Sequence, residues 1–271
     1  MIIDYDIYQL TPYINWDYFF YAWGMHNKPE AERQKLQKEA VAVLSDLEGR
    51  YKIHALFLLL DAHSEGDDIV VDSHDGTVRL PFLRQQEPDS ECLCLADFIQ
   101  PLTSNPSPLT SKIGLFATTV DMGMEKDFDN DAYQKMMVQL LADRLAEAAA
   151  ECMHEAVRKT YWGYAPDENL TMQQLHVEQF QGIRPAVGYP SLPDTSFNFL
   201  LNEILDFHQI GIRLTESGAM KPHASVSGLM IAHPQARYFS LGTIGEDQLC
   251  DYARRRGLPV EVVRKYLSAN L

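Results

Sequence analysis

Arg184, Gly188 and Tyr189 are the residues of this 271-residue chain whose types and spacing best suit the binding of a small molecule. They lie in the stretch 181–194, QGIRPAVGYPSLPD, where three prolines and two glycines favour an irregular loop of fixed shape. An arginine can hold a carboxylate through two parallel hydrogen bonds, a glycine lets a ligand approach the main chain, and a tyrosine offers a flat face with a polar tip. An ordinary surface loop that turns at residues 188–190 explains the composition as well.

Three acids, Asp143, Glu147 and Glu151, follow one another at intervals of four in a stretch with helical periodicity. At that spacing their side chains lie on one helix face and repel one another by about 0.2–0.5 kcal/mol per pair. Two interpretations fit this pattern: a solvated helix face, or an acidic wall that attracts a cation.

Other patterns suggest functions that their surroundings do not support. The D-x-H-x-x-G match at residues 206–211 is a cobalt-binding pattern of corrinoid domains, but it stands at the expected end of a helix and no Gly-Gly pair occurs in the chain. The arginine-rich segment 251–267 has the outline of a helix-turn-helix. The nine histidines show no H-E-x-x-H or comparable spacing, and neither G-x-S-x-G nor a phosphate-binding glycine loop is present. We therefore predict no metal site and no catalytic nucleophile.

Composition limits the class of partner. The net charge of −15 and the pI of about 4.9 argue against nucleic acid, which requires a basic face, and against anionic membrane surfaces. The N-terminus lacks the pattern of a signal peptide, and the longest apolar run, residues 55–60, is too short to span a bilayer. Four cysteines in a chain of this length do not form a disulfide framework. These features predict a cytoplasmic protein with reduced thiols.

The elements that must position the loop are a mixture of helices and strands without regular βαβ alternation. An aromatic entry segment lies within residues 1–28, Asp75–Gly76 is a hairpin signal, and residues 100–111 form a proline-rich loop. We predict an α+β fold, a single domain over residues 1–271 with a largely antiparallel, twisted sheet flanked by helices. The expected helices span residues 29–50, 129–161, 198–208, 246–256 and 260–267, and the expected strands span residues 53–60, 69–72, 77–81, 93–98, 112–120, 226–232 and 238–244.

Five blocks taken together resemble one family, the activation (reactivation) domain at the C-terminus of cobalamin-dependent methionine synthase, which binds S-adenosyl-L-methionine (AdoMet). The resemblance runs from about residue 13 to the last residue, and the family's AdoMet motif R-x-x-x-G-Y is met by Arg184, Gly188 and Tyr189. The blocks are YINWDYFF (13–20), ADRLAEAAAECMHEAVRKTYWGYAPDENL (142–170), QGIRPAVGYPSLPD (181–194), LTESGAMKPHASVSG (214–228) and HPQARYFSLGTIGEDQLCDYARRRG (233–257).

The resemblance implies a function. Domains of this family hold AdoMet over the cobalamin of a neighbouring domain, and an electron from flavodoxin or a similar reductase together with the AdoMet methyl group restores methylcobalamin from inactive cob(II)alamin. The protein supplies position and electrostatics for this reaction. The matched blocks begin close to residue 13, so we expect a stand-alone subunit that acts on a cobalamin-binding methionine synthase or related corrinoid protein of a separate chain, and not a complete enzyme.

The resemblance also implies the AdoMet site. Arg184 is expected at the methionine end of the ligand, Tyr189 at the face that meets the cobalamin domain, and acids near the sulfonium cation. Where the family usually has aspartate this chain has the uncharged Asn15, and Phe239 lacks the hydroxyl of a second tyrosine. An alternative function therefore stays open, a non-catalytic docking module for a corrinoid protein that has lost AdoMet binding. The implied site residues are Asn15, Glu147, Glu178, Arg184, Pro185, Ala186, Gly188, Tyr189, Tyr238 and Phe239.

Overall fold

The computed structural model describes residues 1–74, 76–86, 91–102 and 107–271. Its centre is β2, a 13-residue strand over Ile53–Glu65. One edge of β2 pairs with β5, and the other edge pairs first with β1 and then with β3. All strand pairs of this six-stranded sheet are antiparallel, as predicted. The remaining strands are β1 (Ile2–Tyr5), β3 (Asp68–Ser73), β4 (Gly76–Pro81), β5 (Lys112–Val120) and β8 (Ser225–Met230).

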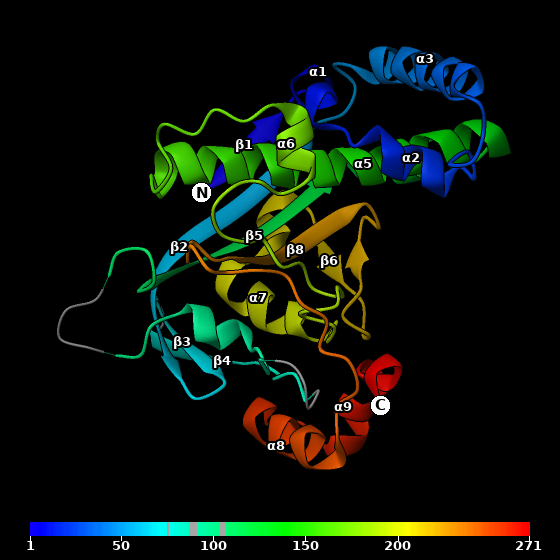
Figure 1. Cartoon of the computed structure of the whole chain (residues 1–271). Helices are drawn as coiled ribbons and strands as arrows, with labels where there is room; N and C mark the ends of the chain where they lie inside the picture. The colour runs from blue at the N-terminus through cyan, green and yellow to red at the C-terminus, as the bar shows by residue number, and fades with distance from the viewer. Residues whose placement is uncertain (75, 87–90, 103–106) are drawn as a thin grey trace.

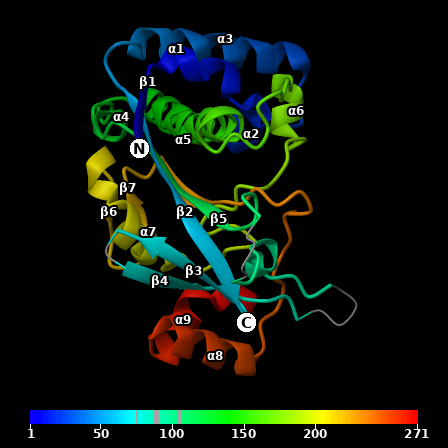
Figure 2. The same cartoon turned by 90° about the vertical axis from the view of Figure 1, so that its left-hand side faces the viewer.

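Helices cover both faces of the sheet (Figures 1 and 2). The longest, α5 (Ala132–Ala156), lies across one face, with α3 (Glu30–Leu47) outside it, and α7 (Phe197–Leu205) packs on the other face. The C-terminal pair α8 (Glu246–Arg256) and α9 (Val260–Tyr266) has a small apolar core of its own. This arrangement confirms the α+β class. Shorter elements are α1 (Ile7–Leu10), α2 (Trp16–Ala22), α4 (Gly123–Lys126), α6 (Met172–His176), β6 (Arg213–Leu214) and β7 (Met220–Lys221).

Helix α5 lies close to β5 around Ala146, where its buried side chains are small. Ala146, Ala148 and Ala149 are buried, and the Thr118 hydroxyl on β5 donates a hydrogen bond of 2.9 Å to the Ala146 carbonyl. The helix begins after Asp131, whose carboxylate accepts hydrogen bonds from two backbone amides of the first turn. It ends in a π-helical turn, Val157–Tyr161, inside the single long helix expected over residues 129–161.

The loop 181–194 runs along the free edge of β8. Ile183 and Ile231 exchange two backbone hydrogen bonds of 2.9 and 3.0 Å, and the Pro185 carbonyl accepts one of 3.0 Å from the Leu229 amide. This contact requires glycine at position 228, because a Cβ there would lie 2.2 Å from the Pro185 carbonyl oxygen. The sheet therefore fixes the loop that carries Arg184.

The strand expected over residues 238–244 is wrong, because this segment has no regular secondary structure. The loop 181–194 already occupies the β8 edge, so the segment has no strand to pair with and is held by single hydrogen bonds, such as the one from the Leu241 amide to the Pro190 carbonyl at 3.1 Å. The strand expected over residues 93–98 is also wrong, since Leu95–Phe98 forms a 3-10 helix and only Cys94 makes an isolated bridge, to Arg84.

Other predictions need smaller corrections. The helix expected over residues 198–208 ends at Leu205, and a 3-10 turn ending at Gly211 follows it. The hairpin of β3 and β4 is present, but Asp75 of its predicted turn, like residues 103–106 of the proline-rich loop, lies outside the described residues. Two arginines at the end of α8 face inward, where Arg255 pairs with Asp68 and Arg256 with Asp194. The single domain over residues 1–271 stays a prediction.

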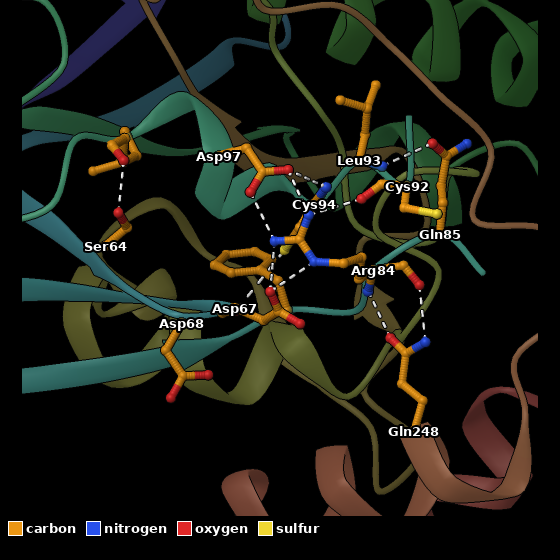
Figure 3. A network of polar contacts seen from close by, with 12 residues as sticks. Ser64, Asp67, Asp68, Arg84, Gln85, Cys92, Leu93, Cys94, Asp97 and Gln248 are labelled. Carbon is orange, nitrogen blue, oxygen red and sulfur yellow. Dashed lines mark hydrogen bonds and ion pairs between the residues drawn. The ribbon is translucent and has the colours of Figure 1, made fainter. Parts of the chain in front are cut away.

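A polar network around Arg84 joins the hairpin, the 3-10 helix and α8 (Figure 3). The Arg84 guanidinium donates to the carboxylates of Asp67 and Asp97 and to the Cys92 carbonyl, at 2.6 to 2.9 Å. The Gln248 side chain of α8 is bonded to both the amide and the carbonyl of Arg84, at 2.6 and 2.9 Å. These contacts connect segments that are far apart in the sequence.

Candidate functional site

A cavity of about 690 Å³ opens between α5, the loop 181–194, the start of α2 and the segment after Tyr238. Its volume is in the range of sites for small organic ligands. Both apolar and polar groups line it. The lining residues are Tyr13, Asn15, Tyr18, Arg144, Glu147, Ala148, Ala150, Glu151, Leu175, His176, Glu178, Arg184, Pro185, Ala186, Tyr189, Pro190, Ser191, Val226, Tyr238, Phe239 and Ser240.

The fold brings nine of the ten predicted site residues to this one cavity. They come from four separate parts of the chain, and the nine are Asn15, Glu147, Glu178, Arg184, Pro185, Ala186, Tyr189, Tyr238 and Phe239. Gly188 is not among the lining residues. Its backbone has φ of +88°, a conformation that favours glycine. The turn before Tyr189 therefore explains why the motif has a glycine at this position. The role of these residues in binding AdoMet stays a prediction.

Two side chains of helix α5 hold the Arg184 guanidinium. Its Nη2 donates a hydrogen bond of 2.8 Å to Oε2 of Glu151, and its Nη1 donates one of 3.2 Å to Nδ1 of His154. Its backbone amide donates to the Tyr238 hydroxyl at 2.9 Å. A guanidinium has five N–H groups, and the contacts among the described residues use two of them. Arg184 therefore keeps donor capacity for a ligand while its orientation is fixed.

Two acids of the cavity, Glu147 and Glu178, have raised pKa values. Burial raises the pKa of Glu147, and Arg144, which donates two hydrogen bonds of 2.8 and 3.1 Å to it, only partly offsets this effect. Burial likewise raises the pKa of Glu178, against the opposing charge of Arg184. A positive ligand group would favour the charged form of both carboxylates.

The row of acids on α5 is divided by the fold. Glu147 and Glu151 line the large cavity, whereas Asp143 lines a second cavity of about 360 Å³ together with Glu125 and His223. Glu147 pairs with Arg144 and Glu151 with Arg184, so arginines already compensate part of the negative charge of this row.

The cavity wall opposite α5 carries Tyr238 and Phe239. Burial raises the pKa of Tyr238 to about 12, and its hydroxyl oxygen accepts a hydrogen bond from the Arg184 amide. The wall is held from outside by Gln85, whose side-chain amide donates to the Ser240 carbonyl at 2.7 Å. At the rim, Asn15 caps α2 by accepting from the Asp17 amide at 3.1 Å.

Tyr189 also lies at the rim, with 52% of its surface exposed. Tyr18 of α2 is 60% exposed and lies under the Arg144 guanidinium, 5.9 Å from ring centroid to carbon. The mouth of the cavity thus carries two exposed tyrosines from different segments. Tyr18 stands in the aromatic block 13–20, but no spacing in the sequence singles it out from its aromatic neighbours.

Sequence reasoning missed two residues that contact Arg184. Glu151 enters the sequence-based expectations only as a member of the acidic row, and His154 is not among the expected site residues. The spacing contains a signal for both, since positions 147, 151 and 154 lie on one helix face. Which of them meets a loop residue 30 or more positions away depends on the fold alone.

Over the described ranges no three His, Cys, Asp or Glu side chains come together in a way that would hold a metal ion. In the same part of the chain, no helix is both long and apolar enough to cross a membrane.

A family model for the activation domain of vitamin B12-dependent methionine synthase matches residues 6–257. The chain belongs to this activation domain family. A similar solved structure is a crystal structure of the MetH reactivation domain bound to AdoHcy, the demethylated product of AdoMet. It aligns with this activation domain at a TM-score of 0.92 and 38% sequence identity, over 100% of this chain and 90% of that chain.

Proposed function

We propose that this activation domain binds AdoMet in the large cavity and supports the reductive methylation of cob(II)alamin on a cobalamin-dependent methionine synthase or related corrinoid protein. The observation that carries the proposal is the gathering of Arg184, Glu147 and Glu178 around one cavity of suitable size. Membership of the family and the AdoHcy-bound neighbour support the same conclusion.

The charges of the cavity suit the charges of AdoMet. Arg184 has N–H groups left for the ligand's carboxylate, and the backbone at Pro185 and Ala186 lines the adjacent wall. Glu147 and Glu178 supply carboxylates for the positive groups of the ligand, its sulfonium and its ammonium. Tyr238 and Phe239 add aromatic surface on the opposite wall.

The domain contributes position to the methyl transfer. When a partner protein brings cobalamin to the mouth of the cavity, that cofactor would supply reduced cobalt as the acceptor of the methyl group, and flavodoxin or a similar reductase would supply the electron. The chain's own groups would hold AdoMet in the cavity, and the exposed Tyr189 is where we expect the partner to meet it. Loss of the methyl group turns the sulfonium into a neutral thioether, which weakens the attraction to Glu147 and Glu178 and favours product release.

Calorimetry provides the first test. We expect AdoMet and AdoHcy to bind the isolated chain and 5′-methylthioadenosine, which lacks the amino-acid end, to bind at least tenfold more weakly. The second test mixes the chain with a cobalamin-loaded methionine synthase that lacks its own activation domain, a reductase and AdoMet, and follows methylcobalamin by absorption. Failure of correctly folded protein to bind AdoMet would refute the proposal, and success of the mixture would support a separate subunit.

The alternative function, a docking module without AdoMet, is favoured by Asn15 and Phe239, which replace residues that could contact the ligand through a charge or a hydroxyl. It predicts that the chain captures a cobalamin-binding domain equally well with and without AdoMet. It also predicts that the Arg184→Ala variant captures that domain as strongly as the wild type.

A further inference from the structure

His154 is the least accessible residue in contact with Arg184. It lies on α5 with 0% of its surface exposed, and it is not among the residues that line the cavity. Its Nδ1 lies 2.9 Å from Nη1 of Arg158 and 3.2 Å from Nη1 of Arg184. One imidazole nitrogen thus faces two guanidinium groups.

This geometry determines the protonation state of the ring. A guanidinium can only donate hydrogen bonds, so Nδ1 of His154 must carry a lone pair and the proton must sit on Nε2. Nε2 has no hydrogen-bond partner within the described part of the chain, and the ring meets Phe180 edge to face at 5.0 Å. Burial, together with the positive charges of Arg184 and Arg158, holds the pKa of His154 well below its ordinary value.

Arg158 is fixed independently of Arg184. It is completely buried, donates three hydrogen bonds of 2.6 to 3.2 Å to the Glu168 carboxylate, and lies 4.1 Å over the Phe180 ring. On one side, His154 therefore contacts Arg158, whose position is fixed by its own hydrogen bonds. On the other side it presents a fixed acceptor to Arg184.

The second contact of Arg184 explains why such an acceptor matters. Glu151 accepts from Arg184 only through Oε2, while its Oε1 is buried without a hydrogen-bond partner among the described residues. Two parallel hydrogen bonds to one carboxylate are the preferred geometry of an arginine. A pairing with both oxygens of Glu151 is therefore the competing orientation of the Arg184 guanidinium.

We propose that His154 is a positioning residue for the ligand, a neutral acceptor that keeps Arg184 from closing onto Glu151 and so leaves its remaining N–H groups directed to the ligand's amino-acid end. The proposal rests on the AdoMet-binding function proposed above. It adds a connection from the Arg158–Glu168 pair, through His154, to the arginine of the R-x-x-x-G-Y motif.

The test compares two substitutions with two ligands by calorimetry at pH 7.5. His154→Leu removes the acceptor, and His154→Gln keeps a side-chain oxygen that can accept. We expect AdoHcy to bind His154→Leu at least tenfold more weakly than the wild type, and His154→Gln within about threefold of it, since a lost charge-assisted hydrogen bond corresponds to about 1.5 kcal/mol or more. Binding of 5′-methylthioadenosine, which has no amino-acid end, should be the same in all three proteins.

The outcomes separate the two proposals. If the wild type does not bind AdoHcy, the proposed function fails. If it binds and His154→Leu binds AdoHcy equally well, the role of His154 is overturned while the function stands. If His154→Leu weakens both ligands equally, His154 only supports the fold, and the positioning role is again overturned.

A measurement on the wild type covers the case in which His154→Leu does not fold. In ¹⁵N NMR of the histidine-labelled chain, with the His154 signals assigned by comparison with His154→Gln, we expect an unprotonated Nδ1 and a protonated Nε2 from pH 6 to 8. We also expect the Nδ1 signal to move when AdoHcy is added. A positively charged ring, a proton on Nδ1, or a signal unmoved by saturating AdoHcy would each overturn the proposal.

Discussion

Two arginines of this domain, Arg84 and Arg184, are surrounded by acids but use their hydrogen bonds differently. Arg84 donates through all five of its N–H groups, to Asp67, Asp97 and the Cys92 carbonyl (Figure 3). Arg184 makes two side-chain hydrogen bonds among the described residues, one to Glu151 and one to His154. Arg84 is nevertheless the more exposed, with 32% of its side chain accessible against 15% for Arg184.

The difference separates a structural arginine from a binding one. Every donor of Arg84 has a protein partner, so the network is complete without a ligand and joins distant segments of the fold. Around Arg184 the polar groups are incompletely satisfied, since Oε1 of Glu151 and Nε2 of His154 are buried without hydrogen-bond partners in the described structure. Unsatisfied polar groups are costly in a folded protein, and they are expected where function requires them.

Of the substitutions that test this comparison, the replacement of Arg184 should have the largest effect, a loss of ligand affinity. Arg184→Ala removes the charge-assisted hydrogen bonds to the ligand's carboxylate, worth about 2–3 kcal/mol, which is roughly a 30- to 150-fold loss of AdoHcy affinity. Calorimetry measures it, with Arg84→Lys as the matched control that should bind within about twofold of the wild type. Equal losses in both variants would contradict the distinction.

Replacing Arg84 should instead lower the stability of the fold. Arg84→Lys cannot reproduce the five hydrogen bonds, because an ammonium has three donors in a different geometry. We expect the free energy of unfolding to fall by about 2 kcal/mol, measured by urea denaturation. Arg184→Lys is the control, and we expect it to lose less than half as much. An unchanged urea midpoint for Arg84→Lys would show that the network does not stabilise the fold.

The binding of AdoMet should be coupled to the release of protons from the acids of the cavity. Burial raises the pKa values of Glu147 and Glu178, so both carboxyls take up protons at a higher pH than an exposed glutamate does. A bound cation favours their charged forms, so AdoMet binding should release protons at mildly acidic pH, and AdoMet affinity should fall as the pH is lowered through their pKa values. Calorimetry in buffers of different ionisation enthalpy measures this release. AdoHcy, whose sulfur is neutral, should release fewer protons, and Glu147→Gln should reduce the difference between the ligands.

Restoring the acid at position 15 should have the smallest effect. Asn15→Asp adds a negative charge at the rim of the cavity and keeps the cap of α2, because aspartate caps a helix as well as asparagine. We expect AdoMet to bind about two- to fivefold more tightly, as for a partly exposed ion pair of up to about 1 kcal/mol, with an unchanged thermal midpoint. If AdoHcy gained as much as AdoMet, the added charge would not be acting on the sulfonium.

The sequence by itself determined much of this protein. Periodicity and turn residues predicted the α+β class, the antiparallel sheet and its main elements, because amphipathic patterns record which face of an element is buried. The five blocks predicted the family, and nine of the ten residues that they implied lie around one cavity. Local patterns predicted a strand at residues 238–244, which was wrong. This segment has no strand edge to pair with, because the loop 181–194 occupies the edge of β8.

Only the tertiary structure decided how the charges are paired. Glu147 and Glu151 are equivalent in the sequence, yet one meets Arg144 on its own helix and the other meets Arg184 from a distant loop. His154 lies in the matched block 142–170 but is not among the expected site residues, and it becomes a contact of Arg184 because β8 holds the loop against α5 through the close approach at Gly228. Hydrogen bonds act over about 3 Å, so their partners depend on how the chain packs and not on spacing along it.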